Sequence, residues 1–111
     1  MSRKLTHDEI QKNFINQVWV MIDWWKNAQV SESDKLSGLA HSILAMIDGC
    51  YGGIPGFILI PDPHEDDKQY CIEHGENYYP QMSDINFEND IGGSLHSMLY
   101  RLTPDIFKDD K

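Results

Sequence analysis

Residues 6–27 combine a helix start signal with an apolar repeat, and this combination constrains the fold more than any other feature of the chain. The Thr6 hydroxyl can accept from the Glu9 backbone N–H, and the Glu9 carboxylate can accept from the Thr6 N–H, which together form a capping box. The sequence therefore predicts a helix over residues 7–27. The apolar face of this helix, at the 3.6-residue period, comprises Ile10, Phe14, Val18, Met21, Ile22 and Trp25.

The same segment holds more apolar residues than a one-sided surface helix needs. The residues outside the face are Ile15, Trp19, Val20 and Trp24. Either the helix is covered on two sides, or part of it meets a partner, for which a homodimer through this first helix is one arrangement. Because tryptophan is enriched in binding hot spots, Trp19 and Trp24 are candidate partner-binding residues. The alternative is that the tryptophans cover a small core.

A second helix is predicted over residues 32–48, where the apolar residues again follow a helical period. Ser31 or Ser33 can cap its start, and acidic residues in its first turn suit the helix dipole. Gly49 suits the left-handed position that commonly follows a helix. The stripe of this helix comprises Leu36, Leu39, Ala40, Ile43, Leu44 and Ile47.

The middle of the chain reads as a loop followed by a β-hairpin. Three glycines and a proline in residues 50–56 predict the loop. The apolar residues 57–60 predict a short buried strand, which Pro61 and Pro63 end because proline cannot donate to a ladder. Residues 69–73 are the expected antiparallel mate across an acidic turn.

The last third of the chain is expected to hold one more helix. Residues 75–89 show no usable period and predict an ordered irregular loop. A final helix is predicted over residues 93–102, with Asp90 or Ser94 as its cap. The tail after it is expected to dock through Phe107.

The order helix, helix, strand, strand, helix predicts a small α+β fold. Residues 1–111 are expected to form one domain, since 41% apolar residues can fill one ordinary core. Residues 1–5 and 108–111 are expected to fray. The predicted core comprises Phe14, Val18, Met21, Leu39, Ile43, Leu44, Ile47, Phe57, Leu59, Leu95 and Leu99.

Acidic residues are concentrated after position 60. Residues 1–60 hold six acids and five bases, whereas residues 61–111 hold twelve acids and four bases, so the net charges are −1 and −8. This excess argues against direct binding to nucleic acid or to anionic membranes, which both require clustered Lys and Arg. It favours a basic protein partner, a divalent cation, or solubility alone.

The chain shows none of the usual signs of secretion or membrane insertion. Its first residues lack an apolar signal-peptide segment, and no apolar run approaches the ~20 residues of a membrane span. Its two cysteines do not imply a disulfide framework. We therefore expect a cytoplasmic protein with reduced thiols.

His64, Cys71 and His74 are the strongest candidates for a metal site, with Asp66 and Asp67 close in sequence. Zinc accepts all three of these ligand types. In a strand, however, Cys71 and His74 would point to opposite faces, because side chains alternate with period two. We therefore expect neither a bound metal nor a cofactor.

No motif in the chain identifies a catalytic residue. Cys50 follows a helix C-terminus, where the dipole disfavours a thiolate. His41 and His96 lie in two similar segments, residues 38–44 and 93–99, which are identical at four of seven positions. Both histidines are expected at the edge of an apolar stripe, where packing is their usual role and a paired-histidine site is the alternative.

Four segments carry a resemblance to known proteins. They read Leu39-Ala-His-Ser-Ile-Leu-Ala-Met-Ile-Asp-Gly49, Pro55-Gly-Phe-Ile-Leu-Ile-Pro-Asp-Pro-His64, Gly75-Glu-Asn-Tyr-Tyr-Pro80 and Asp90-Ile-Gly-Gly-Ser-Leu-His-Ser-Met-Leu-Tyr100. Over residues 36–100 the chain resembles small uncharacterised bacterial and prophage-type proteins. The resemblance implies a bacterial or phage setting and a cytosolic address, and it brings no activity or catalytic residue.

The sequence as a whole predicts a non-catalytic accessory protein that binds another macromolecule, a protein and possibly a basic one, through an acidic face bordered by aromatic residues. The candidate binding residues are Asp62, Glu65, Asp66, Asp67, Tyr78, Tyr79, Trp19 and Trp24. Two alternatives stay open. One is a nucleic-acid mimic, whose carboxylates imitate phosphates and block a DNA-binding protein. The other is a small metal-dependent or histidine-based enzyme.

Overall fold

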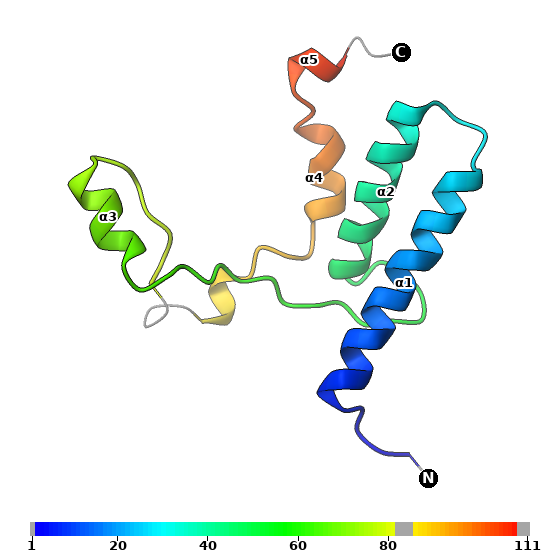
Figure 1. The fold of residues 1–111 in the computed structure, drawn as a ribbon, viewed down its shortest axis with the longest axis horizontal. Helices are drawn as coiled ribbons and strands as arrows, with labels where there is room; N and C mark the ends of the chain where they lie inside the picture. Colours follow the sequence, from blue (N-terminus) through cyan, green and yellow to red (C-terminus); the bar gives the residue numbers. More distant parts are fainter. Residues whose placement is uncertain (1, 82–85, 109–111) are drawn as a thin grey trace.

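The computed structural model describes residues 2–81 and 86–108, and the regular elements within them are helices. These are α1 (His7–Asn27), α2 (Glu32–Ile47), α3 (Asp67–Glu73), the short 3-10 helix η2 (Phe87–Asn89), α4 (Leu95–Arg101) and α5 (Asp105–Lys108). Helices α1, α2 and α4 lie side by side as a helical body, whereas α3 stands apart from them (Figure 1). Positions 82–85 of the expected irregular loop and the last three residues of the tail lie outside the described residues.

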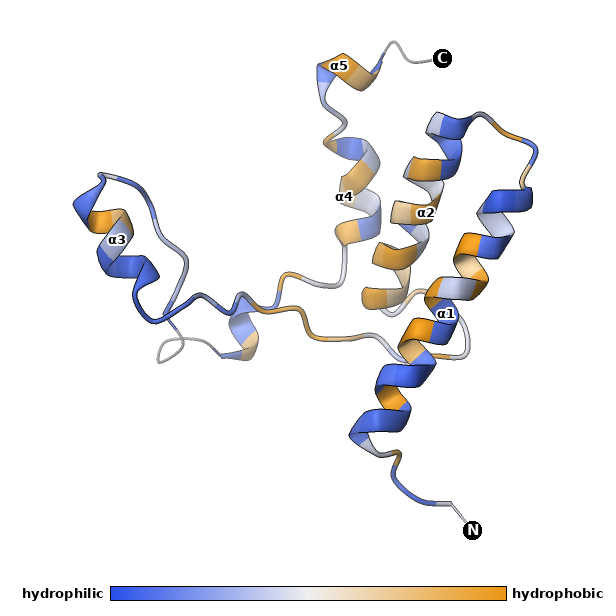
Figure 2. Cartoon of the chain, viewed as in Figure 1, coloured by the Kyte–Doolittle hydropathy of each residue, from blue (hydrophilic) through white to orange (hydrophobic). Residues whose placement is uncertain are grey.

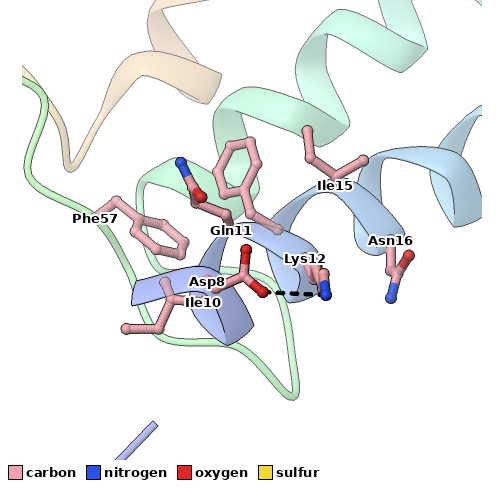
Figure 3. A pocket seen from close by; sticks show the side chains of 8 residues that line it. Asp8, Ile10, Gln11, Lys12, Ile15, Asn16 and Phe57 are labelled. Atoms are coloured by element: carbon pink, nitrogen blue, oxygen red, sulfur yellow. Dashed lines mark ion pairs between the residues drawn. The ribbon is translucent and has the colours of Figure 1, made fainter. Parts of the chain in front are cut away.

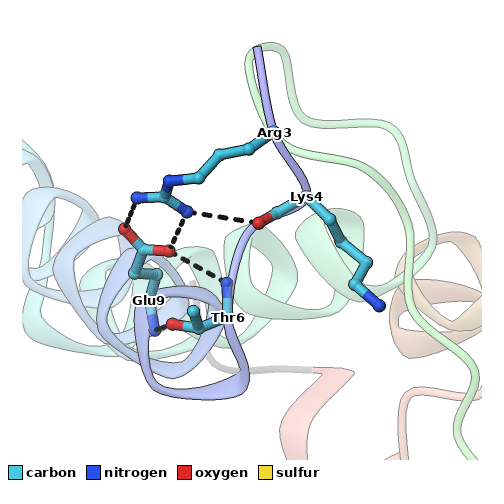
Figure 4. A network of polar contacts seen from close by, with 4 residues as sticks. All are labelled: Arg3, Lys4, Thr6 and Glu9. Carbon is cyan, nitrogen blue, oxygen red and sulfur yellow. Dashed lines mark hydrogen bonds and ion pairs between the residues drawn. The ribbon is translucent and has the colours of Figure 1, made fainter. Parts of the chain in front are cut away.

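The start of α1 confirms the predicted capping box. The Glu9 backbone N–H donates to Thr6 Oγ1 at 3.2 Å, and the Thr6 N–H donates to Glu9 Oε1 at 2.9 Å. The Arg3 guanidinium binds both oxygens of the Glu9 carboxylate at 2.8 Å (Figure 4). The cap therefore ties the residues before the helix to its first turn.

Helix α2 packs between α1 and α4. Its start is capped by Ser31, whose hydroxyl accepts from the Asp34 N–H at 3.1 Å. On the side of α1, the Trp25 indole lies against Gly38 and donates from Nε1 to Ser42 Oγ at 2.9 Å. A Cβ at Gly38 would come within 2.3 Å of the indole ring, so the two helices approach closely only because this position is glycine.

The predicted β-hairpin is wrong, and the α+β class is wrong with it, because the described residues contain helices and no strand. Residues 69–73 lie inside helix α3. This helix starts where the Asp67 carboxylate accepts from the His64 N–H at 3.0 Å, a local bond that makes a turn rather than a strand. The expected turn between two strands is therefore the start of a helix.

Residues 57–60 form no strand, and their hydrogen-bonded neighbour is a later segment than the one expected. The Ile91 N–H donates to the Leu59 carbonyl at 2.8 Å, and the Leu59 N–H donates to Asp90 Oδ1, also at 2.8 Å. Asp90 thus supplies a side-chain acceptor where a strand would supply a carbonyl. Pro61 comes directly after residues 57–60 and has no backbone N–H to donate. The contact is therefore too short to form a β-ladder.

The last major helix is shorter than predicted, and of its two expected caps Asp90 is wrong, whereas Ser94 holds the N-cap position without a side-chain cap hydrogen bond. The Asp90 carboxylate accepts from the N–H groups of Leu59 and Gly92 rather than from α4. The carboxylate of Asp48, at the end of α2, accepts instead from the N–H groups of Gly93 at 2.6 Å and His96 at 2.8 Å. A cap from a residue so distant in the chain docks α4 onto α2 as well as starting it.

The buried core is smaller than expected. Among the hydrophobic residues that the structure describes, only Met21 and Met46 are fully buried, and Met46 was not in the predicted core. Leu59, which was in the predicted core, is 38% exposed. The other predicted core residues are partly exposed.

The molecule is flat, with Cα extents of 53 × 50 × 19 Å. Its radius of gyration is 17.8 Å, whereas a compact chain of this length would have about 13 Å. Viewed down the shortest axis, the helices spread out with little overlap (Figure 1). Because few elements cover one another, the helices bury little of their apolar surface.

Candidate functional site

Residues 60–81 and 86–90, which we call the α3 arm, leave the helical body and return to it at one point. That point is the pair of hydrogen bonds that joins Leu59 to Asp90 and Ile91. The Asp90 carboxylate also accepts from the Gly92 N–H at 2.9 Å, which holds it in place. The arm projects away from α1, α2 and α4 (Figure 1), and its helix α3 is mainly hydrophilic (Figure 2).

All four candidate acids lie on the arm and are exposed. Two of them help to start α3: Asp67 accepts from the His64 N–H, and the Asp66 N–H donates to His64 Nδ1 at 3.2 Å. Asp62 and Glu65 make no hydrogen bond or ion pair with any residue that the structure describes. These two carboxylates are thus free to meet a partner.

The candidate tyrosines lie on the same arm. Tyr79 is 71% exposed, whereas the ring of Tyr78 lies beneath Lys68 Nζ, 5.2 Å from its centroid. The arm adds a third tyrosine that the sequence analysis missed. Tyr70 stacks on His74 with ring centroids 4.0 Å apart, and both are exposed. The i, i+4 spacing of this pair would have indicated the contact, had residues 69–73 been recognised as helical.

The arm carries nearly all of the net charge of the chain. Its residues 60–81 and 86–90 contain eight acids and one base, a net charge of −7, and the whole chain has −9. The one base, Lys68, is the residue over the Tyr78 ring. Residues 91–111 contain three acids and three bases. The acidic half of the sequence is therefore an acidic arm followed by a neutral C-terminal segment.

The argument from side-chain alternation at Cys71 and His74 is wrong, because both residues belong to α3 and its C-terminal cap, and residues three apart in a helix share a face. His74 is engaged elsewhere, with Nδ1 at 2.7 Å from the Tyr70 carbonyl oxygen. His64 lies at the opposite end of α3. Within the described ranges, no three His, Cys, Asp or Glu residues are grouped so that they could hold a metal ion.

A second polar cluster joins α2 to α4 and brings together His41 and His96. The ring centroids of His41 and His96 are 5.6 Å apart, and His41 also stacks on Tyr100 at 5.3 Å. His96 Nδ1 lies 2.6 Å from Asp48 Oδ2, and the Asp48 side chain is fully buried.

The hydrogen bonds to Asp48 decide its protonation state. Burial by itself raises the pKa of this carboxyl, but the backbone and side-chain hydrogen bonds from His96 and those from Gly93 and Leu95 outweigh it and lower the pKa to about 2. An Asp–His pair can orient a general base. Here, however, the carboxylate is occupied by backbone N–H groups of α4, which makes Asp48 a helix cap and interhelical clamp.

Trp19 and Trp24 lie on α1, away from the arm, so the structure divides the candidate binding residues between two parts of the molecule (Figure 1). Trp19 is 64% exposed. Trp24 is also exposed and packs edge-to-face on Trp25, with centroids 4.6 Å apart. The expected single face of acids bordered by all of these aromatics is therefore divided, with the acids and tyrosines on the arm and the two tryptophans on α1.

Comparisons with protein-family models, curated proteins and solved structures find no match to this chain. The resemblance to bacterial and prophage-type proteins therefore stays a prediction. None of the helices that the structure describes combines the length and the apolar character needed to cross a membrane.

Proposed function

We propose that the chain is a non-catalytic binding protein whose α3 arm docks on a basic surface of another protein. The observation that carries this proposal is the segregation of charge. A net charge of −7 lies on residues 60–81 and 86–90 of the arm, which leaves and rejoins the helical body at the pair of bonds at Leu59. A solvated acidic surface needs no such segregation, because solubility depends on net charge rather than on its position.

The side chains on the arm suit a basic partner. Asp62 and Glu65 are exposed and unpaired in the described structure, and Tyr79 presents its ring to solvent. Carboxylates steer a positively charged partner toward the arm and select its orientation. A tyrosine ring can receive a Lys or Arg side chain through a cation–π contact, as Tyr78 already does for Lys68.

The same charge segregation also favours a second candidate function, that of a nucleic-acid mimic. In that case the partner is a DNA-binding protein, and the carboxylates replace phosphates. The two candidates differ in the share of affinity that comes from charge. A mimic loses its partner steeply between about 50 mM and about 500 mM salt, whereas a contact centred on Tyr79 is less sensitive.

The test is a triple variant, Asp62→Lys, Glu65→Lys and Tyr79→Ala, which leaves the Asp67 turn of α3 intact. The matched control is Glu32→Lys with Asp105→Lys, which reverses two charges outside the arm. Both proteins should keep the helical circular dichroism of the wild type. The arm variant should lose the partner that the wild type captures from a lysate of the source cells, and the control should retain it.

The captured partner is then titrated calorimetrically against all three proteins at low and high salt. Equal affinity for the wild type and the arm variant would refute the arm as the binding surface. A loss that is equal in the arm variant and the control would show that only net charge matters.

A further inference from the structure

We infer that two copies of this chain pair through an antiparallel contact between α1 and the α1 of the second copy. The centre of α1 has the composition of an interface core. Residues 13–22 contain no charged side chain, although the chain as a whole is 24% charged. Within this stretch Ile15 is 52% and Trp19 is 64% exposed. Depletion of charge with enrichment of aromatics is typical of the centre of protein–protein interfaces.

The exposed area agrees with an uncovered interface of dimer size. The chain has 8996 Å² of accessible surface, and a compact monomer of its mass would have about 6300 Å². The difference is about 2700 Å² per chain, while permanent dimers bury about 2000–5000 Å² in total. A second copy on α1 can cover part of this excess, and the projecting α3 arm accounts for another part.

The residues on the outer side of α1 are spaced for helix pairing. They recur at alternating intervals of four and three positions, the spacing that places residues along the line of contact between two paired helices. We call this line of residues on α1 the seam. The seam consists of Asp8, Lys12, Ile15, Trp19, Ile22 and Lys26. All of them are exposed except Ile22, which is partly buried beside the face that packs on α2.

The charges on this seam are complementary to themselves only in the antiparallel direction. With a two-fold axis at the level of position 17, Asp8 lies opposite Lys26 of the second copy, and Ile15 lies opposite its Trp19. Lys12 then lies beside Asp23 of the second copy. A parallel pair would instead place Asp8 against Asp8 and Lys26 against Lys26. The order of charges along α1 therefore selects one orientation.

A depression beside Ile15 can receive the second copy's Trp19. Figure 3 shows this pocket of about 590 Å³, which lies between the first half of α1 and Phe57. Phe14 and Ile15 give it apolar walls, and the ion pair of Asp8 with Lys12 at 3.0 Å lies at its edge. A tryptophan seated in an apolar pocket is a common energetic centre of an interface.

The distribution of charge between body and arm also fits self-association at α1. Residues 1–60 have a net charge of only −1, so two bodies repel each other weakly. In Figure 1, α1 and the α3 arm lie on opposite sides of the body, so pairing through α1 keeps the two acidic arms apart. This inference does not depend on the function proposed for the arm.

The first test measures mass against concentration by sedimentation equilibrium for the full chain. The wild type should be a dimer at micromolar concentration. Trp19→Glu should raise the dimer dissociation constant at least roughly a hundredfold, because the substitution removes both central tryptophans of a symmetric dimer. The control Leu36→Glu replaces a residue on α2 that is 72% exposed and lies off the seam, and it should leave the constant unchanged. A wild type that is monomeric throughout, or equal effects of the two substitutions, would refute the inference.

The second test concerns orientation and does not rely on one variant that could misfold. Asp8→Lys and Lys26→Asp should each weaken the dimer by roughly tenfold, because each turns two attractive contacts into repulsive ones. Combining both substitutions in one chain should restore the affinity toward that of the wild type. Circular dichroism checks that α1 persists, since the substitutions oppose the helix dipole. Single substitutions without effect, or a double variant weaker than both, would contradict the antiparallel register.

Discussion

At the scale of single residues, Asp48 is the side chain that joins two helices. It ends α2, and its buried carboxylate accepts from the Gly93 N–H, from the His96 N–H and from the His96 ring. One side chain therefore accepts from two backbone N–H groups at the start of α4 that would otherwise lack a partner. Helix α4 has no side-chain cap of its own, so its position depends on this contact.

Asp48→Asn should destabilise the protein by roughly 2–4 kcal/mol, because the amide cannot replace the charge and turns a donor toward His96. The change is measured as the free energy of unfolding in urea. Asp105→Asn, at an exposed carboxylate of α5, should change it by less than about 0.5 kcal/mol. Equal values for Asp48→Asn and the wild type would show that α4 is held by other contacts.

The same carboxylate predicts a pH dependence. Its pKa is lowered to about 2 from an ordinary value of 3.8, so the folded state holds the proton less tightly than the unfolded state does. The stabilisation is therefore complete above about pH 4 and is lost as the pH falls toward about 2, with a size of about 2 kcal/mol.

Unfolding of the wild type and of Asp48→Asn, measured side by side between about pH 5 and about pH 2, isolates this contribution from those of the other carboxylates. The stability difference between the two proteins should shrink toward acid pH. A constant difference would mean that protonation of Asp48 does not change the stability of the protein in this pH range.

At the scale of elements, the contact of α1 with α2 depends on the absence of a side chain at Gly38. The Trp25 ring occupies the space that a Cβ would need, and its hydrogen bond to Ser42 restricts its movement. Gly38→Ala should therefore destabilise the protein by about 1–3 kcal/mol through overpacking, although alanine is the better helix former.

The matched control is Gly52→Ala, where a Cβ meets no atom within 4 Å and the backbone does not require glycine. That substitution should be neutral or slightly stabilising. Thermal melting of both variants gives the comparison. A Gly38→Ala protein that melts above the wild type would show that the indole can move aside and that helix propensity dominates.

At the scale of the whole molecule, the α3 arm should be removable. Leu59 and Ile91 are hydrogen-bonded neighbours, so replacing residues 61–89 with a turn of about four residues can close the gap. The shortened protein should melt within about 3 °C of the wild type, since the arm adds no fully buried side chain.

The shortened protein should still form the dimer through α1 and should lose the basic partner. Circular dichroism, sedimentation and calorimetry measure these three properties separately. A large drop in melting temperature would show that the arm supports the body. Loss of the dimer alone would place the arm within the pairing surface.

The sequence by itself determined the first two helices, because capping and apolar periodicity act between residues a few positions apart. His7–Asn27 and the cap at Ser31 follow from such local signals. It also indicated the exposed acids at Asp62 and Glu65, since charged residues outside a core remain solvated.

Only the tertiary structure decided the pairing of Leu59 with Asp90 and Ile91, the capping of α4 by Asp48, and the contact of His41 with His96. Each joins residues more than thirty positions apart, and several acids could have filled the role of Asp48 or Asp90. The helical state of residues 69–73 depended on the turn that Asp67 makes with His64, where local bonding competes with strand formation. Local patterns cannot choose among such distant partners, because the choice is made by which elements pack together.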